Sequence, residues 1–428
     1  MRRFFRQFLT ATAVSILNKA VGVLTSIALA RLLLPEGYGL YTLVFSIVLL
    51  ANSFADIGVF QAVTKYAAET EEDGDIVWTG FVIDGAVTIT LFFLCLLLAS
   101  PIGHWMDKPI SNLVILCSLY LVPCSLDIYN ARLLARRRIE LLSMLSLAYT
   151  LLSALFSICL VYSGHGIIGA IAGYIIAKTI ITVVTIRLGW VRGRIDRSWA
   201  KRLLSFGIFS YVSMLSSVII GHVDRIVLGF FVPSDALGSY SVAKGSAGLI
   251  EYIPSAFAGV AFPVVSRAQA ENDMPRLKKV YEAGFFGCGI YAMAATMGAL
   301  VFASPLIRWV FGMKYMGAIP VFQVLIFSSM ATCLLSVFLM MLNATGKPSL
   351  VAQISIFQSL IGLAILPALA WMMGNIGIAL ADIIVQTIGT VFGYRAVTKS
   401  TGLKVKFSLE SVSSFFRLLV QQAGFEEK

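Results

Sequence analysis

Apolar residues fill this chain in runs of about 20 residues, separated by short polar segments. About 20 apolar helical residues cross a hydrocarbon core, and only helices and closed barrels satisfy their backbone groups there. The pattern therefore predicts an all-α polytopic membrane protein. About twelve transmembrane helices are expected, at residues 9–32, 38–62, 77–100, 111–131, 141–163, 166–187, 204–232, 236–262, 281–304, 317–342, 349–372 and 375–396.

The composition agrees with this pattern and disfavours several functions. Of 428 residues, 58% are hydrophobic and 13% charged. The six cysteines lie inside apolar runs without metal-ligand spacing, so they are predicted to be small core residues. The sequence contains no nucleophile elbow, phosphate loop or zinc motif, and its connecting segments are short. We therefore expect neither an enzyme nor a metal or cofactor site.

The basic residues are distributed unevenly between the predicted loops. With the N-terminus in the cytoplasm, the inner segments carry most of the lysines and arginines, whereas the outer loops carry only Arg31, Lys108, Arg308 and Lys314. This asymmetry predicts a multi-pass protein of the cell membrane with both termini cytoplasmic. The net charge of +11 then serves topology and anionic lipid headgroups, and no nucleic-acid partner is expected. No removable signal peptide is predicted, because a small-residue cleavage site is missing.

The chain repeats itself. "LLLPEGYGLYTL" (32–43) matches "FFVPSDALGSYSV" (230–242), and "GIIGAIAGYII" (166–176) matches "GNIGIALADII" (374–384). Each half holds six predicted spans, an even number, so the halves share one orientation and form two parallel pseudo-symmetric lobes. The aligned residues are Pro35 with Pro233, Gly39 with Gly238, Tyr41 with Tyr240, Gly166 with Gly374, and Gly169 with Gly377.

This repeat predicts four regions. They are an N-terminal six-helix lobe (1–187), a cytoplasmic linker (188–203), a C-terminal six-helix lobe (204–397) and a cytoplasmic tail (398–428). Within the tail, Leu409, Val412, Phe416 and Leu419 share one helical face, which predicts an amphipathic interfacial helix. Docking to a partner protein is the alternative for this tail.

Polar residues recur at intervals of three and four in four spans that are equivalent under the repeat, so each set shares one helix face. Small polar residues also mark tight helix packing, but packing does not explain the charged members. We therefore predict that the four faces line one wet cavity between the lobes. The sets are Ser15, Asn18, Lys19, Gly22 and Ser26; Ser46, Ser53 and Asp56; Ser210, Ser213, Ser217, Gly221, Asp224 and Arg225; and Ser241, Lys244, Gly248, Glu251 and Ser255.

Other charged residues lie inside predicted spans but off these faces. For Asp84, Asp127 and Lys178 we expect structural pairs, and Asp127 lies near the cytoplasmic end of its span. Asp382 has no predicted role. A structural pair with a neighbouring span is also the alternative for Asp224 and Arg225.

Three segments resemble a known family. "ALARLLLPEGYGLYTLVFSIVLLANSFADIGVFQAVTKY", "DRIVLGFFVPSDALGSYSVAKG" and "LLNATGKPSL" (341–350) resemble signatures of the polysaccharide-biosynthesis flippases of O-antigen type. Their superfamily also contains multidrug and toxin extruders and lipid II flippases. The resemblance covers essentially the whole chain. It implies two lobes in a V around a central cavity, alternating access, and a saccharide carried on a polyprenyl phosphate or diphosphate.

The resemblance also implies a substrate site. Cations on the first, second, seventh and eighth spans would bind the anionic headgroup, here Lys19, Arg225 and Lys244, with Arg31 near the mouth. The polar groups of Asn18, Asp56, Asp224 and Glu251 could bond sugar hydroxyls. An inside-negative potential supplies about 2.3 kcal/mol per charge per 100 mV to an outward-moving diphosphate, so no nucleotide site is needed. Membrane lipids and other polysaccharide-assembly proteins are the further partners expected.

Other functions remain open. A cation-coupled multidrug exporter of the same superfamily would exchange a proton or sodium for a cationic drug, although cations on the same faces disfavour such substrates. A membrane glycosyltransferase or polymerase would need a large polar loop, and the outer loops here are short. A scaffold without transport activity is the last alternative.

Overall fold

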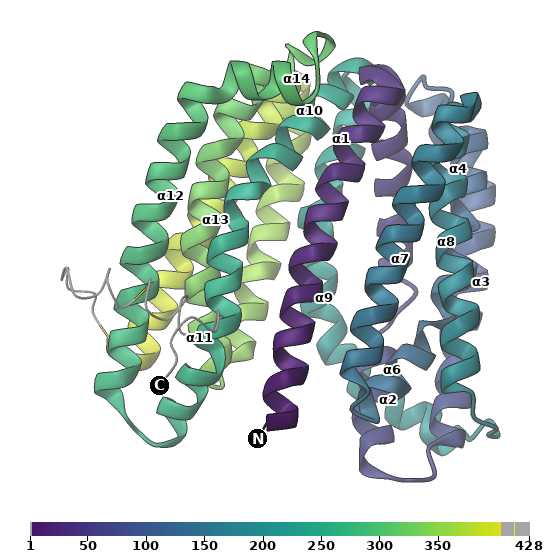
Figure 1. The fold of residues 1–428 in the computed structure, drawn as a ribbon, viewed down its shortest axis with the longest axis vertical. Helices are drawn as coiled ribbons and strands as arrows, with labels where there is room; N and C mark the ends of the chain where they lie inside the picture. Colours follow the sequence, from purple (N-terminus) through teal and green to yellow (C-terminus); the bar gives the residue numbers. More distant parts are fainter. Residues whose placement is uncertain (1, 404–414, 416–428) are drawn as a thin grey trace. The chain divides into compact units, whose positions relative to one another are not determined.

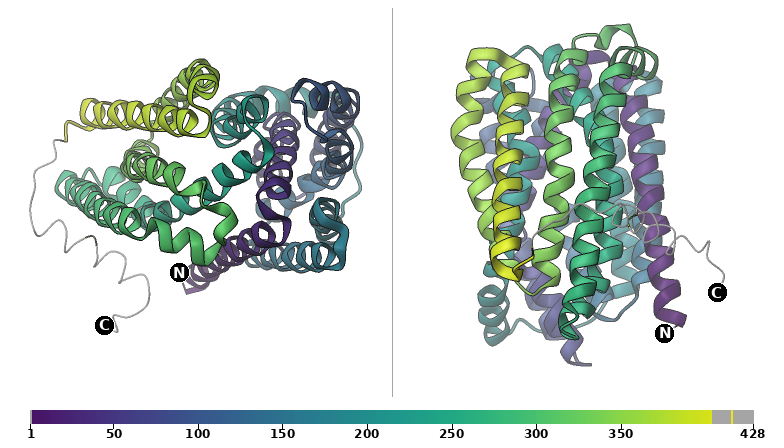
Figure 2. Two further views of the ribbon diagram at one scale, coloured as in Figure 1. Left: turned by 90° about the horizontal axis from the view of Figure 1, so that it is seen from above. Right: turned by 90° about the vertical axis from the view of Figure 1, so that its left-hand side faces the viewer.

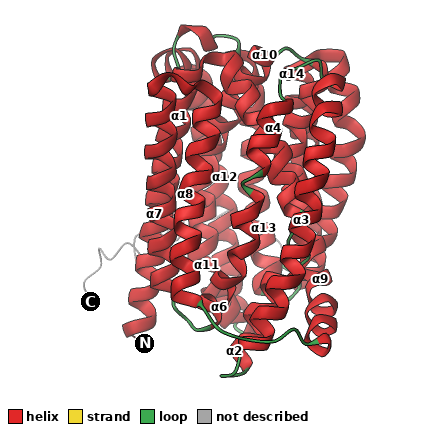
Figure 3. Cartoon of the chain, turned by 90° about the vertical axis from the view of Figure 1, so that its right-hand side faces the viewer, coloured by secondary structure: helices red, strands yellow, loops and turns green. Residues whose placement is uncertain are grey.

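In a computed structural model the chain folds into helices joined by short turns (Figures 1 and 3). The structure describes residues 2–403 and Phe415, and no strand occurs among them. Side chains are described from Ala13 onward, except at 208–210, 212–214, 216, 217 and 220. Ser210, Ser213 and Ser217 therefore lie outside the described side chains, and the predicted interfacial helix of the tail lies outside the described residues apart from Phe415.

Eight helical segments among the described residues are long and apolar enough to cross a membrane. Three of them, of 41, 51 and 54 residues, contain residues with non-helical backbone angles, at Leu34, at Gly164 with Gly166, and at Gly374. Since about 20 residues suffice for one crossing, each of these three has the length of two predicted spans. The predicted spans lie largely in helices, but the span 38–62 is interrupted between Ser53, where one helix ends, and Val59, where the next begins. The number of spans, twelve, stays a prediction.

The first compact unit comprises residues 1–238. Its core includes Val63, Val77, Ile128 and Tyr129, which are almost fully buried. Its elements are α1 (Arg2–Ser53), α2 (Val59–Glu69), α3 (Gly74–Trp105), α4 (Ser111–Ser118), α5 (Leu121–Cys124), the 3-10 turn η1 (Ser125–Asp127), α6 (Ile128–Ala135), α7 (Ile139–Leu160), the π-helical turn η2 (Val161–His165), α8 (Gly166–Gly189), α9 (Arg197–Phe231) and the start of α10 (Ser234–Ala247).

The second unit comprises residues 239–428. Within it α12, α13 and α14 pack side by side (Figure 2). Phe415 lies in its core, with its ring centroid 5.0 Å from that of Phe257. Its elements are the rest of α10, the 3-10 turn η3 (Gly248–Glu251), α11 (Tyr252–Ala270), α12 (Met274–Val310), the 3-10 turn η4 (Met313–Tyr315), α13 (Ala318–Ala344) and α14 (Pro348–Thr401).

The second pair of repeat segments adopts the same turn twice. Gly166 has φ 51° and ψ −135°, and Gly374 has φ 55° and ψ −129°. This backbone region is open essentially to glycine. A Cβ on Gly169 would press against the backbone of Leu160, as a Cβ on Gly377 would against that of Leu369. The matched glycines therefore serve one purpose in both copies, a tight reversal between two helices.

The first pair of repeat segments packs together within the first unit. Proline disfavours a helical conformation in the residue before it, so α1 breaks at Leu34 before Pro35 and α9 ends before Pro233. A Cβ on Gly39 would overlap the carbonyl oxygen of Ser234, and a Cβ on Gly238 would overlap that of Pro35. The two turns therefore approach through their backbones, which only glycine permits at these positions.

The boundary between the two packed units differs from the boundary between the two repeats. It falls between Gly238 and Ser239, because α9 packs on α1, α2 and α3 and thus belongs to the first unit. The repeat instead places the lobe boundary in the linker 188–203. Packing and internal repetition are different properties, so the two six-helix lobes and their V-shaped arrangement stay predictions.

Candidate functional site

The predicted site residues of α1 lie before its break at Leu34. Lys19 and Arg31 are exposed. The amide nitrogen of Asn18 donates a hydrogen bond of 2.9 Å to the hydroxyl of Ser146 on α7. Ser26 and Tyr38 are joined by a hydrogen bond of 2.7 Å between their hydroxyls. Asn18 and Ser26 therefore bond within the first unit, and the role of Lys19 and Arg31 in a substrate site stays a prediction.

Asp224 and Arg225 lie in the C-terminal half of α9. Asp224 is 3% exposed, and its Oδ1 accepts a hydrogen bond of 2.7 Å from the backbone N–H of Arg225. Arg225 Nη1 donates to the carbonyl oxygen of Gly221, 3.5 Å away, on the same helix. Neither of these bonds links the two side chains to each other. They show a buried acid and a half-buried base on adjacent positions of one helix.

In the second unit two carboxylates are held by adjacent serines of α13. Ser329 donates a hydrogen bond of 2.8 Å to Glu251 at the end of η3. Ser328 donates one of 2.8 Å to Asp382 on α14. Lys244 is half-buried on α10, two helical turns before Glu251. No role was predicted for Asp382, and the structure places it beside Glu251 through the adjacent residues Ser328 and Ser329.

Asp56, the site residue predicted on the second span, lies in the break between α1 and α2. Its Oδ1 accepts a hydrogen bond of 3.1 Å from the backbone N–H of Phe60. It lines a cavity of about 410 Å³ inside the first unit. The other polar side chains that line this cavity are Asn52, Gln61, Asp84, Cys124, Asp127 and Asn130.

Asp127 and Lys178 form the ion pair expected for them. Lys178 Nζ lies 2.8 and 2.7 Å from the two carboxylate oxygens of Asp127. Asn130 donates a third hydrogen bond to Asp127, of 2.9 Å, and Lys178 also lies 5.9 Å from the ring centroid of Tyr149. The prediction of a pair is confirmed for these two residues. It is wrong for Asp84, which has no hydrogen bond or ion pair with the described part of the chain.

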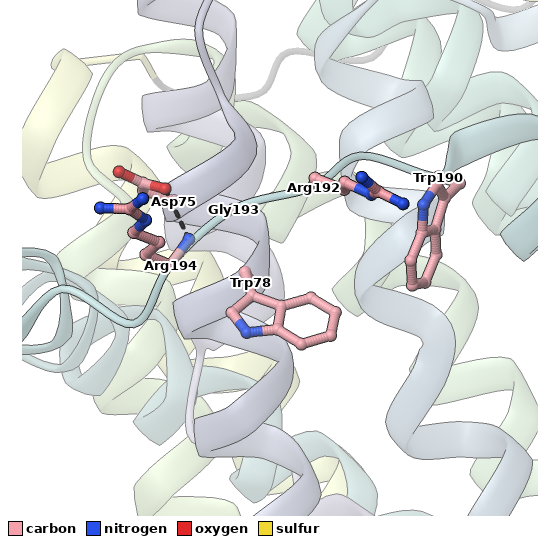
Figure 4. Close-up of a pocket in the computed structure, with 6 residues that line it drawn as sticks. All are labelled: Asp75, Trp78, Trp190, Arg192, Gly193 and Arg194. Carbon is pink, nitrogen blue, oxygen red and sulfur yellow. Dashed lines mark hydrogen bonds between the residues drawn. The ribbon is translucent and has the colours of Figure 1, made fainter.

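The predicted linker is attached to the start of α3, as Figure 4 shows. The backbone N–H of Arg194 donates a hydrogen bond of 2.6 Å to the carboxylate of Asp75, and the backbone N–H of Asp196 donates one of 3.0 Å to the hydroxyl of Thr79. Gly74 and Gly193 meet through their backbones, where a Cβ would not fit. The Ser198 backbone N–H bonds Asp196 at 2.7 Å, and such bonds hold the pKa of that carboxyl below its ordinary value. The linker segment is therefore fixed to the first unit.

A shallow pocket of about 710 Å³ opens beside this attachment. Its wall includes the indoles of Trp78 and Trp190 and the guanidinium groups of Arg192 and Arg194. In Figure 4 the Arg192 side chain extends toward Trp190, and that of Arg194 lies beside Asp75. Guanidinium groups bind phosphates and aromatic rings offer apolar faces, so this pocket can contact a lipid headgroup.

Other charges that the sequence analysis assigned to topology have structural partners. The side chain of Asp73 is 1% exposed, and its carboxylate forms ion pairs with the guanidinium groups of Arg132 and Arg136, with an N–O distance of 2.9 Å in each. Lys108 donates to the carbonyl oxygens of Gly229 and Val232 at the end of α9, at 2.7 and 2.9 Å. Burial lowers the pKa of Lys108 from its ordinary value. The acceptors of Lys108 are backbone atoms, so no side-chain pattern could have revealed this contact.

These features define a multi-pass helical membrane protein with charged and polar groups inside its helical units, the architecture of a membrane transporter. Its fold is similar to that of a structure described as "Lipid II flippase MurJ, inward closed conformation", with a TM-score of 0.78, 15% identity, and coverage of 98% of this chain and 94% of that one. An inward-facing multidrug resistance MATE family transporter gives a TM-score of 0.70 at 15% identity, covering 91% of this chain and 98% of that one.

The chain belongs to the polysaccharide biosynthesis protein family, whose profile matches residues 28–320. The "Probable flippase AglR" of Haloferax volcanii is 24% identical over 389 residues, which are 89% of this chain and 80% of that protein. The lipopolysaccharide biosynthesis protein WzxC of Escherichia coli strain K12 is 22% identical over 392 residues, 89% of this chain and 77% of that protein.

Proposed function

We propose that the protein is a flippase that moves a polyprenyl-(di)phosphate-linked oligosaccharide from the cytoplasmic to the outer leaflet by alternating access. The observation that carries this proposal is the family match over residues 28–320. The relatives named as flippase and lipopolysaccharide biosynthesis proteins support it, as does the fold shared with a lipid II flippase. The product would serve the assembly of cell-surface glycans in the plasma or inner membrane, with both termini in the cytoplasm.

In this proposal the protein binds and releases its substrate without breaking covalent bonds. Lys19, Arg225 and Lys244, with Arg31 at the mouth, neutralise the phosphates in turn. Asn18, Asp56, Asp224 and Glu251 bond sugar hydroxyls. Half-buried Lys244 and Arg225 are suited to this because a charge in a partly dehydrated site binds an anion more strongly than in water. The membrane potential drives the outward movement of the negative headgroup.

Export of a lipid-linked saccharide tests this proposal. In cells whose own flippase has been deleted, the protein should restore surface glycan, and Arg225→Ala and Lys244→Ala should reduce export while the protein remains at normal abundance. Lys314→Ala, an exposed lysine of η4, is the matched control and should export normally. Normal export by both site variants would remove these residues from the site.

A charge series at Lys19 tests the site separately. If the ammonium contacts a phosphate, Lys19→Arg should keep much of the export, Lys19→Gln should lose most of it, and Lys19→Glu should abolish it. Equal export by the Arg and Gln variants would show that the charge is not used.

The fold shared with a multidrug transporter keeps a cation-coupled drug exporter as the second candidate. A drug-susceptibility assay in a hypersensitive host distinguishes the two. Resistance conferred without any effect on lipid-linked saccharides would favour the drug exporter.

A further inference from the structure

The 410 Å³ cavity of the first unit holds a carboxylate that lacks a partner. Asp84 is 7% exposed and lies on α3, ten residues or about 15 Å along the helix from Gly74. No hydrogen bond or ion pair reaches its carboxylate from the described residues. An ionised carboxylate inside a membrane is costly when unpaired, and such residues are rare without a function.

The other acids at this cavity are already satisfied. Asp127 is neutralised by Lys178 and bonded by Asn130. Asp56 accepts the backbone N–H of Phe60. Neither a lysine nor an arginine is among the residues that line this cavity. When Asp84 is ionised, no side chain in the cavity wall compensates its negative charge.

The chemistry of the wall indicates what would compensate it. Asn52, Gln61 and Asn130 supply carboxamide groups, and Asp56 supplies a second carboxylate. Oxygen ligands of this kind suit hard cations. Among the described residues, no three His, Cys, Asp or Glu side chains are placed together to hold a metal ion. Of the three carboxylates in the wall, Asp127 is paired with Lys178, Asp56 accepts a backbone N–H, and Asp84 alone is without a hydrogen bond from the described residues, so Asp84 is the carboxylate that is open to a single positive charge.

The size of the cavity agrees with a partly hydrated ion. A water molecule occupies about 30 Å³ in the liquid, so 410 Å³ holds an ion together with several waters.

We propose that this cavity binds a small monovalent metal cation, with Asp84 as its charged ligand and with carboxamide oxygens and water completing its coordination. The site goes beyond the proposed glycan transport, because a cation bound here could couple to movement of any substrate. Its occupancy can be measured without a saccharide.

The test uses the full-length protein purified in detergent, with no lipid-linked saccharide present. Thermal unfolding is measured while NaCl replaces choline chloride at constant ionic strength. A ligand that binds the folded state raises its melting temperature by mass action. The wild-type protein should therefore melt several degrees higher in NaCl, and Asp84→Asn should lose this difference. Asp235→Asn, which removes an exposed carboxylate of α10, should keep it.

Binding of radioactive ²²Na⁺ to the wild-type protein and to Asp84→Glu provides a second measurement if Asp84→Asn does not fold. Saturable binding by the wild type, weakened at least tenfold in Asp84→Glu, would support the site. A sodium-dependent melting shift that persists in Asp84→Asn would overturn it, and so would a wild-type protein that neither shifts nor binds. Loss of export with normal sodium binding would count against the flippase and not against the cation site.

Discussion

Replacing Lys178 or Asp127 should show how strongly their ion pair stabilises the first unit. The repeat suggests the substitution Lys178→Gln. Gly166 and Gly374 are 208 residues apart, and the same shift places Gln386 at the position of Lys178. Gln386 is neutral and accepts a hydrogen bond of 3.1 Å from Gln358. The same helix position is thus occupied by an ion pair in one copy and by an amide pair in the other.

The magnitude follows from the exposure of each partner. Removing one member of a buried pair costs about 3–5 kcal/mol. The Asp127 side chain is 35% exposed and that of Lys178 is 14% exposed. Water and Asn130 can therefore serve Asp127 in Lys178→Gln, for which we expect about 2–3 kcal/mol, below the buried-pair range. Asp127→Asn leaves the more deeply buried lysine uncompensated, and we expect about 3–5 kcal/mol.

The double variant gives the decisive comparison. With both charges replaced by amides, Asp127→Asn with Lys178→Gln should recover to within about 1 kcal/mol of the wild type, because no uncompensated charge remains. Unfolding of the purified protein in detergent, followed by tryptophan fluorescence against denaturant, measures all four proteins. The reasoning is refuted if the double variant is as unstable as the sum of the single ones, or if Lys178→Gln is the more damaging single change.

Two further stability changes can be measured in the same way. Gly39→Ala should destabilise the protein by about 1–3 kcal/mol, because the added Cβ overlaps the backbone of Ser234. The control is Gly298→Ala, whose Cβ would meet no atom within 4 Å. Equal destabilisation by the two substitutions would contradict the close approach at Gly39. Lys108→Met should cost about 1.5–3 kcal/mol through the loss of charged hydrogen bonds to α9. Lys314→Met is its control, and an unchanged melting temperature in Lys108→Met would mean that these bonds contribute nothing.

The sequence predicted the positions of the membrane helices well because length and apolarity determine them locally. It also placed span boundaries next to Gly166 and Gly374, where an identical local requirement produced identical residues. Contacts between distant segments were harder to predict. Asp84 and Asp127 both looked like members of structural pairs, but among the described side chains only Asp127 has a cation within reach, and that cation is 51 residues away. The partners of Lys108 are carbonyl groups, which every residue possesses, so side-chain identity carries no information about them.

The approach of the two proline-glycine turns also bears on the origin of the chain. Gly39 of the first copy rests on Ser234 of the second, while Gly238 of the second rests on Pro35 of the first. This reciprocity characterises an isologous interface, in which a patch pairs with its own counterpart across a two-fold axis. A homodimer of half-length subunits in parallel orientation would make this contact through one glycine per subunit. Gene fusion would then have joined the two subunits and preserved their interface as an internal contact, leaving each copy free to acquire its own charges, such as Lys178 in one and Gln386 in the other.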